Sequence, residues 1–334
     1  MCDARAPVRA MLKHVQMQNL LMPDSDPVLS GLPIGLVSQF PLDYLHLVCL
    51  GVMRRLLLCW TRGPLLTRLP AAKINAISDK LLSLSSYIPR EFARKPRSLN
   101  DVMRWKATEF RQFLLYTGPV VLRGVLPEPL YENFILLCVG ITILVTPRLC
   151  QIQCDYASQL LTVCVENMKV LYGEGMLLYN VHGLIHLAGD VRRFGTLDKF
   201  SAFPFENALK RIKKLVRKPS LPLQQLTDRL FEKQQFGKTE TLAFRDRNAA
   251  VFKKEHFLGP VPCDLVNVPV KQYEQLYYRD MFIAVSRGDN CVSLADGKPC
   301  LVRNVFPTTT NRCYLLNIFQ TTIVFLTNHC PQYI

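Results

Sequence analysis

Apolar residues recur at helical spacing over the first two thirds of the chain. Between residues 43 and 235 they return every three or four positions, which is the period of a helix packed on one side. This pattern predicts helices at 43–60, 71–88, 105–117, 128–145 and 155–172. Three more follow: one containing "YNVHGLIHLAGDVRRFG", one after Pro204 and one ending near Gln235. The stretch 43–60 is apolar on almost every side, which predicts a buried helix.

The pattern changes to short β-branched runs after Phe236. These runs, bounded by Gly, Asp, Asn and Pro, are "MFIAVS", "NCVSLADGKPCLVRNVF", "RCYLLNIF" and "TTIVFL". Within the second of them, "ADGK" is a hairpin turn signal. The stretch "FKKEHFLGPVPCDLV" is interpreted as a linker. We therefore expect a predominantly helical α+β chain, with one domain at 1–235 and a small β domain at 236–334.

Charge and cysteine content narrow the class of partner and compartment. The 334 residues carry 41 Lys and Arg against 26 Asp and Glu, a net charge of +15. Such an excess favours an anionic partner, nucleic acid first and an acidic membrane second. Twelve cysteines occur without any Cys-x-x-Cys spacing, which favours buried thiols over a disulfide framework. With no signal peptide and no apolar run above 12 residues, we expect a nuclear or cytoplasmic protein without a membrane span.

The segment "FSAFPFENALKRIKKLVRK" predicts an amphipathic helix with a basic flank. Its apolar positions share one face, which is expected to dock on a core. Nine Lys or Arg and two acids lie between residues 192 and 218. Such a stripe can follow the phosphates of duplex DNA. The residues proposed to bind DNA are Arg192, Arg193, Lys210, Lys213, Lys214 and Arg217.

Glu206 and a histidine pair are the local candidates for a metal site. Glu206 precedes Lys210 by four residues and stands in a first helical turn, so an ion pair and the helix dipole explain it as well as a metal does. His182 and His186 lie one helical turn apart, a spacing that zinc can use, but no third ligand is evident. Structural histidines packing near the helix of Glu206 are the favoured interpretation of that pair.

Three stretches in the right order resemble the CACTA (En/Spm-like) DNA transposases and their animal relatives. They are "FPLDYLHLVCLGVMRRLLLCW", "RWKATEFRQFLLYTGPVVLRGVLP" and "HGLIHLAGDVRRFGTLDKFSAFPFENALKRIKKLVR". The resemblance covers roughly residues 1–235, and the β domain resembles the tail of the animal versions. It implies an RNase H-like core interrupted by a helical insertion at roughly 62–175. It also implies an Asp-Asp-Glu triad that binds two Mg²⁺ ions for strand cleavage and transfer.

Carried onto this chain, the resemblance makes Asp3, Asp43 and Glu206 the catalytic and Mg²⁺-binding residues. His46, one turn after Asp43, would support the site. Two features depart from the family: the Cys-x-x-Cys knuckle is absent, and Asp3 follows Met1 so closely that the strand preceding the first Asp is missing. We therefore expect a truncated or domesticated derivative with an incomplete core.

Three functions follow from these observations. The leading one is a catalytically impaired, transposase-derived protein that retains DNA binding. The second is an active Mg²⁺-dependent nuclease and strand transferase. The third is a non-enzymatic interaction module that binds chromatin or a protein through the β domain. Self-association as a homo-oligomer is left open by the sequence.

Overall fold

The computed structural model describes residues 39–236, 250–261, 271–278, 281–293, 299–307, 313–316 and 323–325. The predicted site residue Asp3 lies outside these ranges. From Asp43 onward the chain forms one compact unit. It is mostly helical, with small antiparallel sheets near the C-terminal end, which confirms the predicted α+β class.

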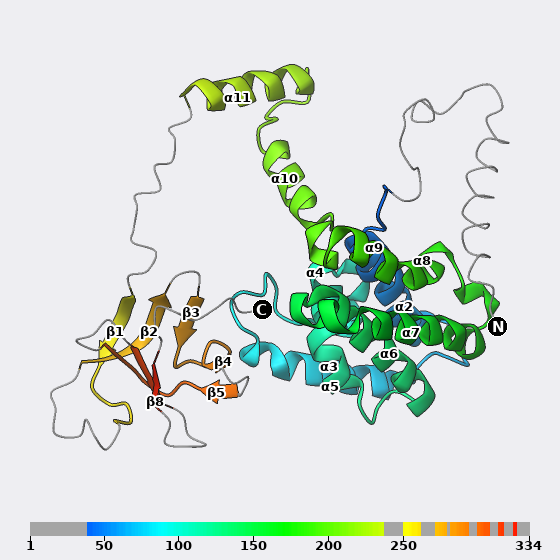
Figure 1. The fold of residues 1–334 in the computed structure, drawn as a ribbon, viewed down its shortest axis with the longest axis horizontal. Helices are drawn as coiled ribbons and strands as arrows, with labels where there is room; N and C mark the ends of the chain where they lie inside the picture. Colours follow the sequence, from blue (N-terminus) through cyan, green and yellow to red (C-terminus); the bar gives the residue numbers. More distant parts are fainter. Residues whose placement is uncertain are drawn as a thin grey trace. The chain divides into compact units, whose positions relative to one another are not determined.

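Helices account for all the regular structure described between residues 39 and 236 (Figure 1). The α-helices are α2 (Arg54–Arg62), α3 (Ala71–Leu84), α4 (Ala107–Gln112), α5 (Gly118–Leu122), α6 (Glu128–Val145), α7 (Pro147–Tyr172), α8 (Tyr179–Gly183), α9 (Leu187–Phe194), α10 (Phe203–Lys213) and α11 (Pro222–Phe236). Two π-helical segments are η1 (Leu45–Met53) and η4 (Phe113–Thr117). The short 3-10 turns are η2 (Ser85–Tyr87), η3 (Leu99–Arg104), η5 (Glu174–Met176), η6 (Leu184–His186) and η7 (Leu197–Lys199).

The predicted helices agree with these bounds except at some ends. The prediction for 128–145 coincides with α6. Helix α7 begins earlier than predicted, at Pro147, because proline is compatible with a first helical turn. Its backbone leaves helical geometry at Gln153 (φ −122°, ψ 18°), close to the predicted start at 155. The residues from Pro147 to the kink at Gln153 are therefore an extension of the helix and not a loop.

The core of the helical part is built around aromatic side chains. Trp60 of α2 and Phe134 of α6 meet edge to face with ring centroids 6.0 Å apart, and Phe113 of η4 joins them at 6.2 Å from Phe134. The indole Nε1 of Trp60 donates to the hydroxyl of Tyr172 at 3.0 Å, which satisfies the one polar atom of that ring. Most of η1 is buried, as its all-round apolar pattern predicts.

Helix α6 is long and apolar enough to cross a membrane by length and composition. Half of its 18 residues are buried inside the protein. A core helix of a soluble domain passes the same test, so this feature is weak evidence for a membrane span.

Buried thiols occur where the sequence analysis expects them. Cys49, Cys138 and Cys164 are buried and free. Burial raises the pKa of Cys49 and of Cys164 to about 12, because the thiolate would lose its hydration. These thiols are therefore packing groups and not nucleophiles at neutral pH.

The C-terminal part forms an antiparallel sheet of six strands and a separate hairpin. The sheet contains β1 (Val251–His256), β2 (Gln272–Tyr278), β3 (Met281–Ala284), β6 (Val305–Pro307), β7 (Cys313–Leu316) and β8 (Ile323–Phe325). Strands β4 (Cys291–Ser293) and β5 (Pro299–Leu301) pair antiparallel on either side of the predicted hairpin turn. The turn itself lies outside the described residues.

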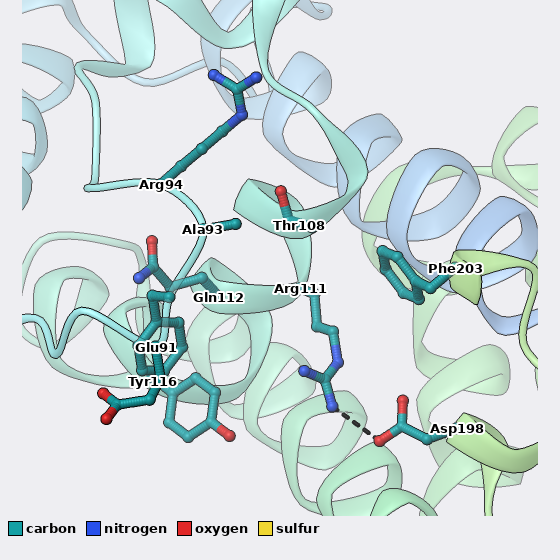
Figure 2. A pocket seen from close by; sticks show the side chains of 10 residues that line it. Glu91, Ala93, Arg94, Thr108, Arg111, Gln112, Tyr116, Asp198 and Phe203 are labelled. Carbon is teal, nitrogen blue, oxygen red and sulfur yellow. Dashed lines mark hydrogen bonds and ion pairs between the residues drawn. The ribbon is translucent and has the colours of Figure 1, made fainter. Parts of the chain in front are cut away.

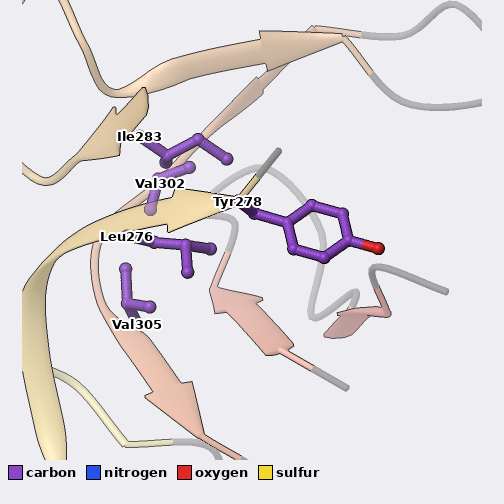
Figure 3. Packing of buried hydrophobic residues seen from close by; sticks show 5 residues of the cluster. All are labelled: Leu276, Tyr278, Ile283, Val302 and Val305. Carbon is purple, nitrogen blue, oxygen red and sulfur yellow. The ribbon is translucent and has the colours of Figure 1, made fainter. Parts of the chain in front are cut away.

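Two strands, β1 and β2, were missed by the sequence analysis. The start of the predicted linker is β1, which pairs with β2 over Val251↔Tyr277 to His256↔Gln272. The charged pattern of β1 hid it, because this strand is at the end of the sheet order and much of it stays exposed. The sheet buries a small apolar cluster (Figure 3), made of Leu276, Tyr278, Ile283, Val302 and Val305.

Candidate functional site

Asp43 caps the start of the first described helix. Its Oδ2 accepts hydrogen bonds from the backbone N–H of His46 at 3.0 Å and from the His46 ring Nδ1 at 2.5 Å. Its Oδ1 accepts from the N–H of Leu45 at 3.3 Å. Aspartate is favoured here because the first N–H groups of a helix have no partner within the helix. The local role of Asp43 is therefore a helix cap.

The same carboxylate also holds the start of α10. Asp43 Oδ1 accepts a hydrogen bond from the N–H of Ala202 at 2.7 Å, across 159 residues of chain. One residue further along each segment, the rings of Tyr44 and Phe203 meet edge to face with centroids 6.2 Å apart. Tyr44 is fully buried, and burial raises the pKa of its hydroxyl. A polar contact and an aromatic contact thus fix α10 to the beginning of η1.

Glu206 faces the same histidine that contacts Asp43. Its Oε1 lies 3.9 Å from His46 Nε2, so the imidazole stands between the two carboxylates. Glu206 is in the first turn of α10, as predicted, where the helix dipole favours a negative charge. The salt-bridge alternative named Lys210 as the partner, but the ion-pair distance that occurs for Glu206 is to His46. Asp43, His46 and Glu206 are therefore the three predicted site residues that come together.

The hydrogen bonds around Asp43 compete with binding of Mg²⁺. Both carboxylate oxygens already accept N–H hydrogen bonds, two each, whereas Mg²⁺ needs oxygen lone pairs in a near-octahedral arrangement. Within the described ranges, no group of three or more His, Cys, Asp or Glu side chains is placed to hold a metal. Asp3 is not among the residues described. The described part of the predicted triad is therefore organised as a cap with an ion pair beside it.

His182 and His186 form a contact pair one helical turn apart. Their Nε2 atoms are 3.3 Å apart and their ring centroids 5.2 Å apart. The pKa of His186 is lowered, first by burial and then by the neighbouring His182 ring, with Arg193 adding to the effect and Asp190 opposing it. The lowered pKa favours the neutral form of His186.

We expect this pair to make stability depend on pH below about 6.5, the ordinary histidine pKa. Because the pKa of His186 is lower in the folded than in the unfolded protein, protonation favours unfolding as pH falls through that range. Replacing His186 with glutamine should flatten the fall in unfolding free energy between about pH 6.5 and 5. Urea unfolding of the wild type and the His186→Gln variant across these pH values measures this pH dependence. If the unfolding free energies of the two proteins fell in parallel as pH drops, the prediction would be contradicted.

Two of the six proposed DNA-binding residues are engaged within the protein. Arg192 pairs with Asp155, and Arg193 Nη2 lies 2.5 Å from the buried Asp190. The other four, Lys210, Lys213, Lys214 and Arg217, are exposed and form no ion pair with any carboxylate of the described ranges. Their charge is therefore available to an outside anion.

The predicted docking of α10 on a core is wrong for the described structure. No residue of α10 is buried, and Phe205 and Leu209 are 68% and 49% exposed. The helix ends at Lys213, so Arg217 lies beyond it. There, the Gln225 side chain accepts from the backbone N–H groups of Arg217 and Lys218. Only the N-terminal end of α10 is anchored, through the contacts of Ala202 and Phe203.

A small cavity lies beside this anchor (Figure 2). It measures about 300 Å³, and Phe203 forms part of its wall. Arg111 points to Asp198 at 2.9 Å, and its guanidinium lies 6.0 Å from the Tyr44 ring centroid. The lining residues are Glu91, Phe92, Ala93, Arg94, Thr108, Arg111, Gln112, Tyr116, Asp198 and Phe203. Two arginines and two carboxylates balance, so the cavity has no net preference for an anion.

The sequence analysis named the residues that come together here but did not identify the capping hydrogen bonds of Asp43. An Asp immediately before an apolar run is itself a helix-cap signal, which could have identified the role of Asp43. No local signal could have identified the N–H of Ala202 as its long-range partner. No family model matches the chain, and no curated protein or solved structure is significantly similar to it.

Proposed function

We propose that this chain is a transposase-derived DNA-binding protein whose carboxylate pair now supports structure in place of strand cleavage. The observation that carries the proposal is the anchoring of α10 at one end. Asp43 and Tyr44 hold its start, while its lysines are exposed and form no ion pair with a carboxylate of the described ranges. A helix held in this way can present its charges to a phosphate backbone.

The resemblance to CACTA transposases is consistent with this arrangement. It expects the second Asp and the Glu to meet across a long helical insertion, and Asp43 and Glu206 lie on either side of one imidazole. An RNase H-like sheet is not part of the described residues 39–236, so the proposal concerns the helices that carry these two residues. The expected location of such a protein is the nucleus.

The mode of binding proposed is electrostatic and independent of base sequence. Lys210, Arg211, Lys213 and Lys214 are exposed in or directly after α10. Each lysine or arginine that neutralises a DNA phosphate releases a counterion, so the affinity falls as salt rises. We therefore propose duplex DNA as the partner, bound mainly through phosphate contacts.

Replacing Lys210, Lys213 and Arg217 with alanine should weaken duplex DNA binding and reduce its salt dependence. The slope of log K against log salt is expected to fall by about 0.9 per lost phosphate contact, up to about 2.7. Fluorescence anisotropy with a labelled duplex between about 50 and 200 mM salt measures the slope. A matched variant removes the same charge from Lys73, Lys80 and Arg123, which are exposed elsewhere and should leave the slope unchanged. Equal effects of the two variants would contradict the proposal.

An active Mg²⁺-dependent nuclease is the second candidate, favoured by the convergence of Asp43 and Glu206. Replacing Glu206 with glutamine separates the two functions. It should abolish Mg²⁺-dependent nicking if the pair is catalytic. If the pair is structural, no nicking is lost and DNA binding stays equal or becomes slightly tighter, because one negative charge beside the lysines is removed. Plasmid nicking and duplex binding are measured on the same preparations.

A further inference from the structure

A second, larger cavity lies on the helical part and is not explained by DNA binding through α10. It measures about 620 Å³. We call it the Arg54 groove. Its lining residues are Leu50, Gly51, Arg54, Arg55, Leu58, Cys59, Arg62, Gly63, Met103, Leu178, Asn180 and Val181. They come from η1, α2, the turn η3 and the start of α8, so the walls are formed by packed helices.

The charge in the groove has one sign. Among the described residues that line it, three are arginines and none carries a carboxylate. Arg55 is already held, because its Nη2 donates to the carbonyl of Gly175 at 2.7 Å and its Nε contacts the Met176 sulfur at 3.1 Å. Arg54 and Arg62 form no ion pair with a carboxylate of the described ranges. Two guanidinium groups are therefore free to pair with acids from outside.

Apart from Asn180, the rest of the lining is largely apolar, and part of it is exposed. Leu50 and Leu58 line the groove from η1 and α2, and Met103 and Leu178 remain 47% and 50% exposed. Leucine and methionine side chains at such exposure are available to cover apolar surface of a partner. The groove thus combines an apolar lining with basic groups, a composition that neither a free anion nor a plain apolar ligand matches.

The groove is preformed by a close approach of two segments. A Cβ at Gly51 would stand 2.5 Å from Asn180 Nδ2 and 2.9 Å from the carbonyl oxygen of His46, so glycine lets η1 and the start of α8 meet. Since these walls are already in contact, little ordering is required when a partner binds.

We propose that the Arg54 groove binds an acidic amphipathic helix of a partner protein. Apolar and basic side chains alternate along the groove at intervals of four residues, in the order Leu50, Arg54, Leu58 and Arg62. At 1.5 Å per residue, the stretch from Leu50 to Arg62 is about 18 Å long, about three turns of a docked helix. A helix with leucines on one face and Glu or Asp at its edge matches both groups, as in other helix-in-groove complexes.

A nucleic-acid strand fits the groove less well. Only two arginines are free to contact phosphates, and none of the lining residues is an aromatic side chain on which bases could stack. A bound nucleic-acid strand would also place charged phosphates against the apolar side chains of Leu50, Met103 and Leu178. Covering these side chains with phosphates would add no favourable hydrophobic free energy to binding. A peptide helix covers the apolar surface and satisfies the arginines together.

Selection from a displayed library of helical 18-residue peptides on the full chain tests the proposal. We expect enriched peptides to carry apolar residues at helical spacing with Glu or Asp at the edge. One such synthetic peptide, labelled for fluorescence anisotropy, should bind the Arg54→Glu/Arg62→Glu variant at least about tenfold more weakly. The variant Lys73→Glu/Lys80→Glu makes the same charge change outside the groove and should bind within about twofold of wild type. Circular dichroism spectra and melting temperatures establish that both variants fold.

Three results would overturn the proposal. The first is enrichment of peptides without acidic residues, or no enrichment. The second is unchanged affinity in the groove variant that folds normally. The third is displacement of the peptide by duplex DNA together with an equal loss of DNA binding in the groove variant, which would make the groove part of a DNA surface. The alanine variant at Lys210, Lys213 and Arg217 should keep peptide affinity, so failure of DNA binding and failure of the groove proposal are separately visible.

Discussion

Replacing Asp43 with alanine should lower the free energy of unfolding by about 2–4 kcal/mol. A helix cap contributes about 0.5–2 kcal/mol, and a hydrogen bond to a charged group about 1.5–3 kcal/mol. Asp43 provides both, through the N–H groups of His46 and Ala202. The loss should also release the start of α10. Urea unfolding followed by circular dichroism measures the change, and duplex DNA affinity should fall in the same variant.

The matched control is Glu206, the other carboxylate of the pair. Its side chain is exposed and its ion pair with His46 is 3.9 Å long, so Glu206→Gln should change the unfolding free energy by no more than about 0.5 kcal/mol. If the two acids instead formed a metal site, removing either one should relieve repulsion in the metal-free protein. A stabilising Asp43→Ala variant would therefore rule out the cap as its main role.

Replacing Glu109 with alanine should cost about 3 kcal/mol, at the lower end for a broken buried ion pair. Glu109 is 3% exposed, and its two oxygens lie 2.6 and 2.9 Å from Arg97 Nε and Nη2. It also accepts from the N–H of Lys106 at 2.8 Å, which caps α4. The cost is at the low end because Arg97 is one-third exposed and can turn to water. Thermal and urea unfolding measure the loss.

Two further variants serve as comparisons for Glu109→Ala: one at Arg97, the ion-pair partner of Glu109, and one at a surface glutamate. Arg97→Ala should destabilise at least as much as Glu109→Ala, because it leaves the nearly buried carboxylate with only Arg94, 3.9 Å away, as a charged partner. Glu132 of α6 is exposed, so Glu132→Ala should stay within about 0.5 kcal/mol. A Glu109 variant as stable as the Glu132 variant would show that the ion pair contributes nothing.

Asp43 and Glu109 stabilise the segments that carry the two surfaces proposed to bind partners. Asp43 fixes the end of α10, which carries the lysines proposed to contact DNA. Glu109 ties the segment before η3 to the start of α4, and Met103 of η3 lines the Arg54 groove. Loss of either acid should therefore affect binding as well as stability, and the unfolding measurements are needed to separate the two.

The sequence by itself determined the helical elements and the meeting of Asp43 with Glu206 that the family resemblance implied. Helices such as α6 follow from periodicity because each buries a stripe of its own residues. It did not reveal β1, whose charged residues are stable in a strand only because β2 pairs with them. The amphipathic spacing of α10 led to the incorrect prediction that this helix docks on a core. Such spacing shows that a helix has an apolar face, but it does not show whether another element covers that face.

Only the tertiary structure decided what the acids do and where free positive charge remains. Asp43 also anchors the start of α10, because the N–H of Ala202, 159 residues away, donates to its carboxylate. Arg192 has the same charge as Lys210, but Asp155, 37 residues away in sequence, pairs with it. Hydrogen bonds and ion pairs depend on distances of a few ångströms between residues far apart in sequence, and local pattern carries no information about those distances.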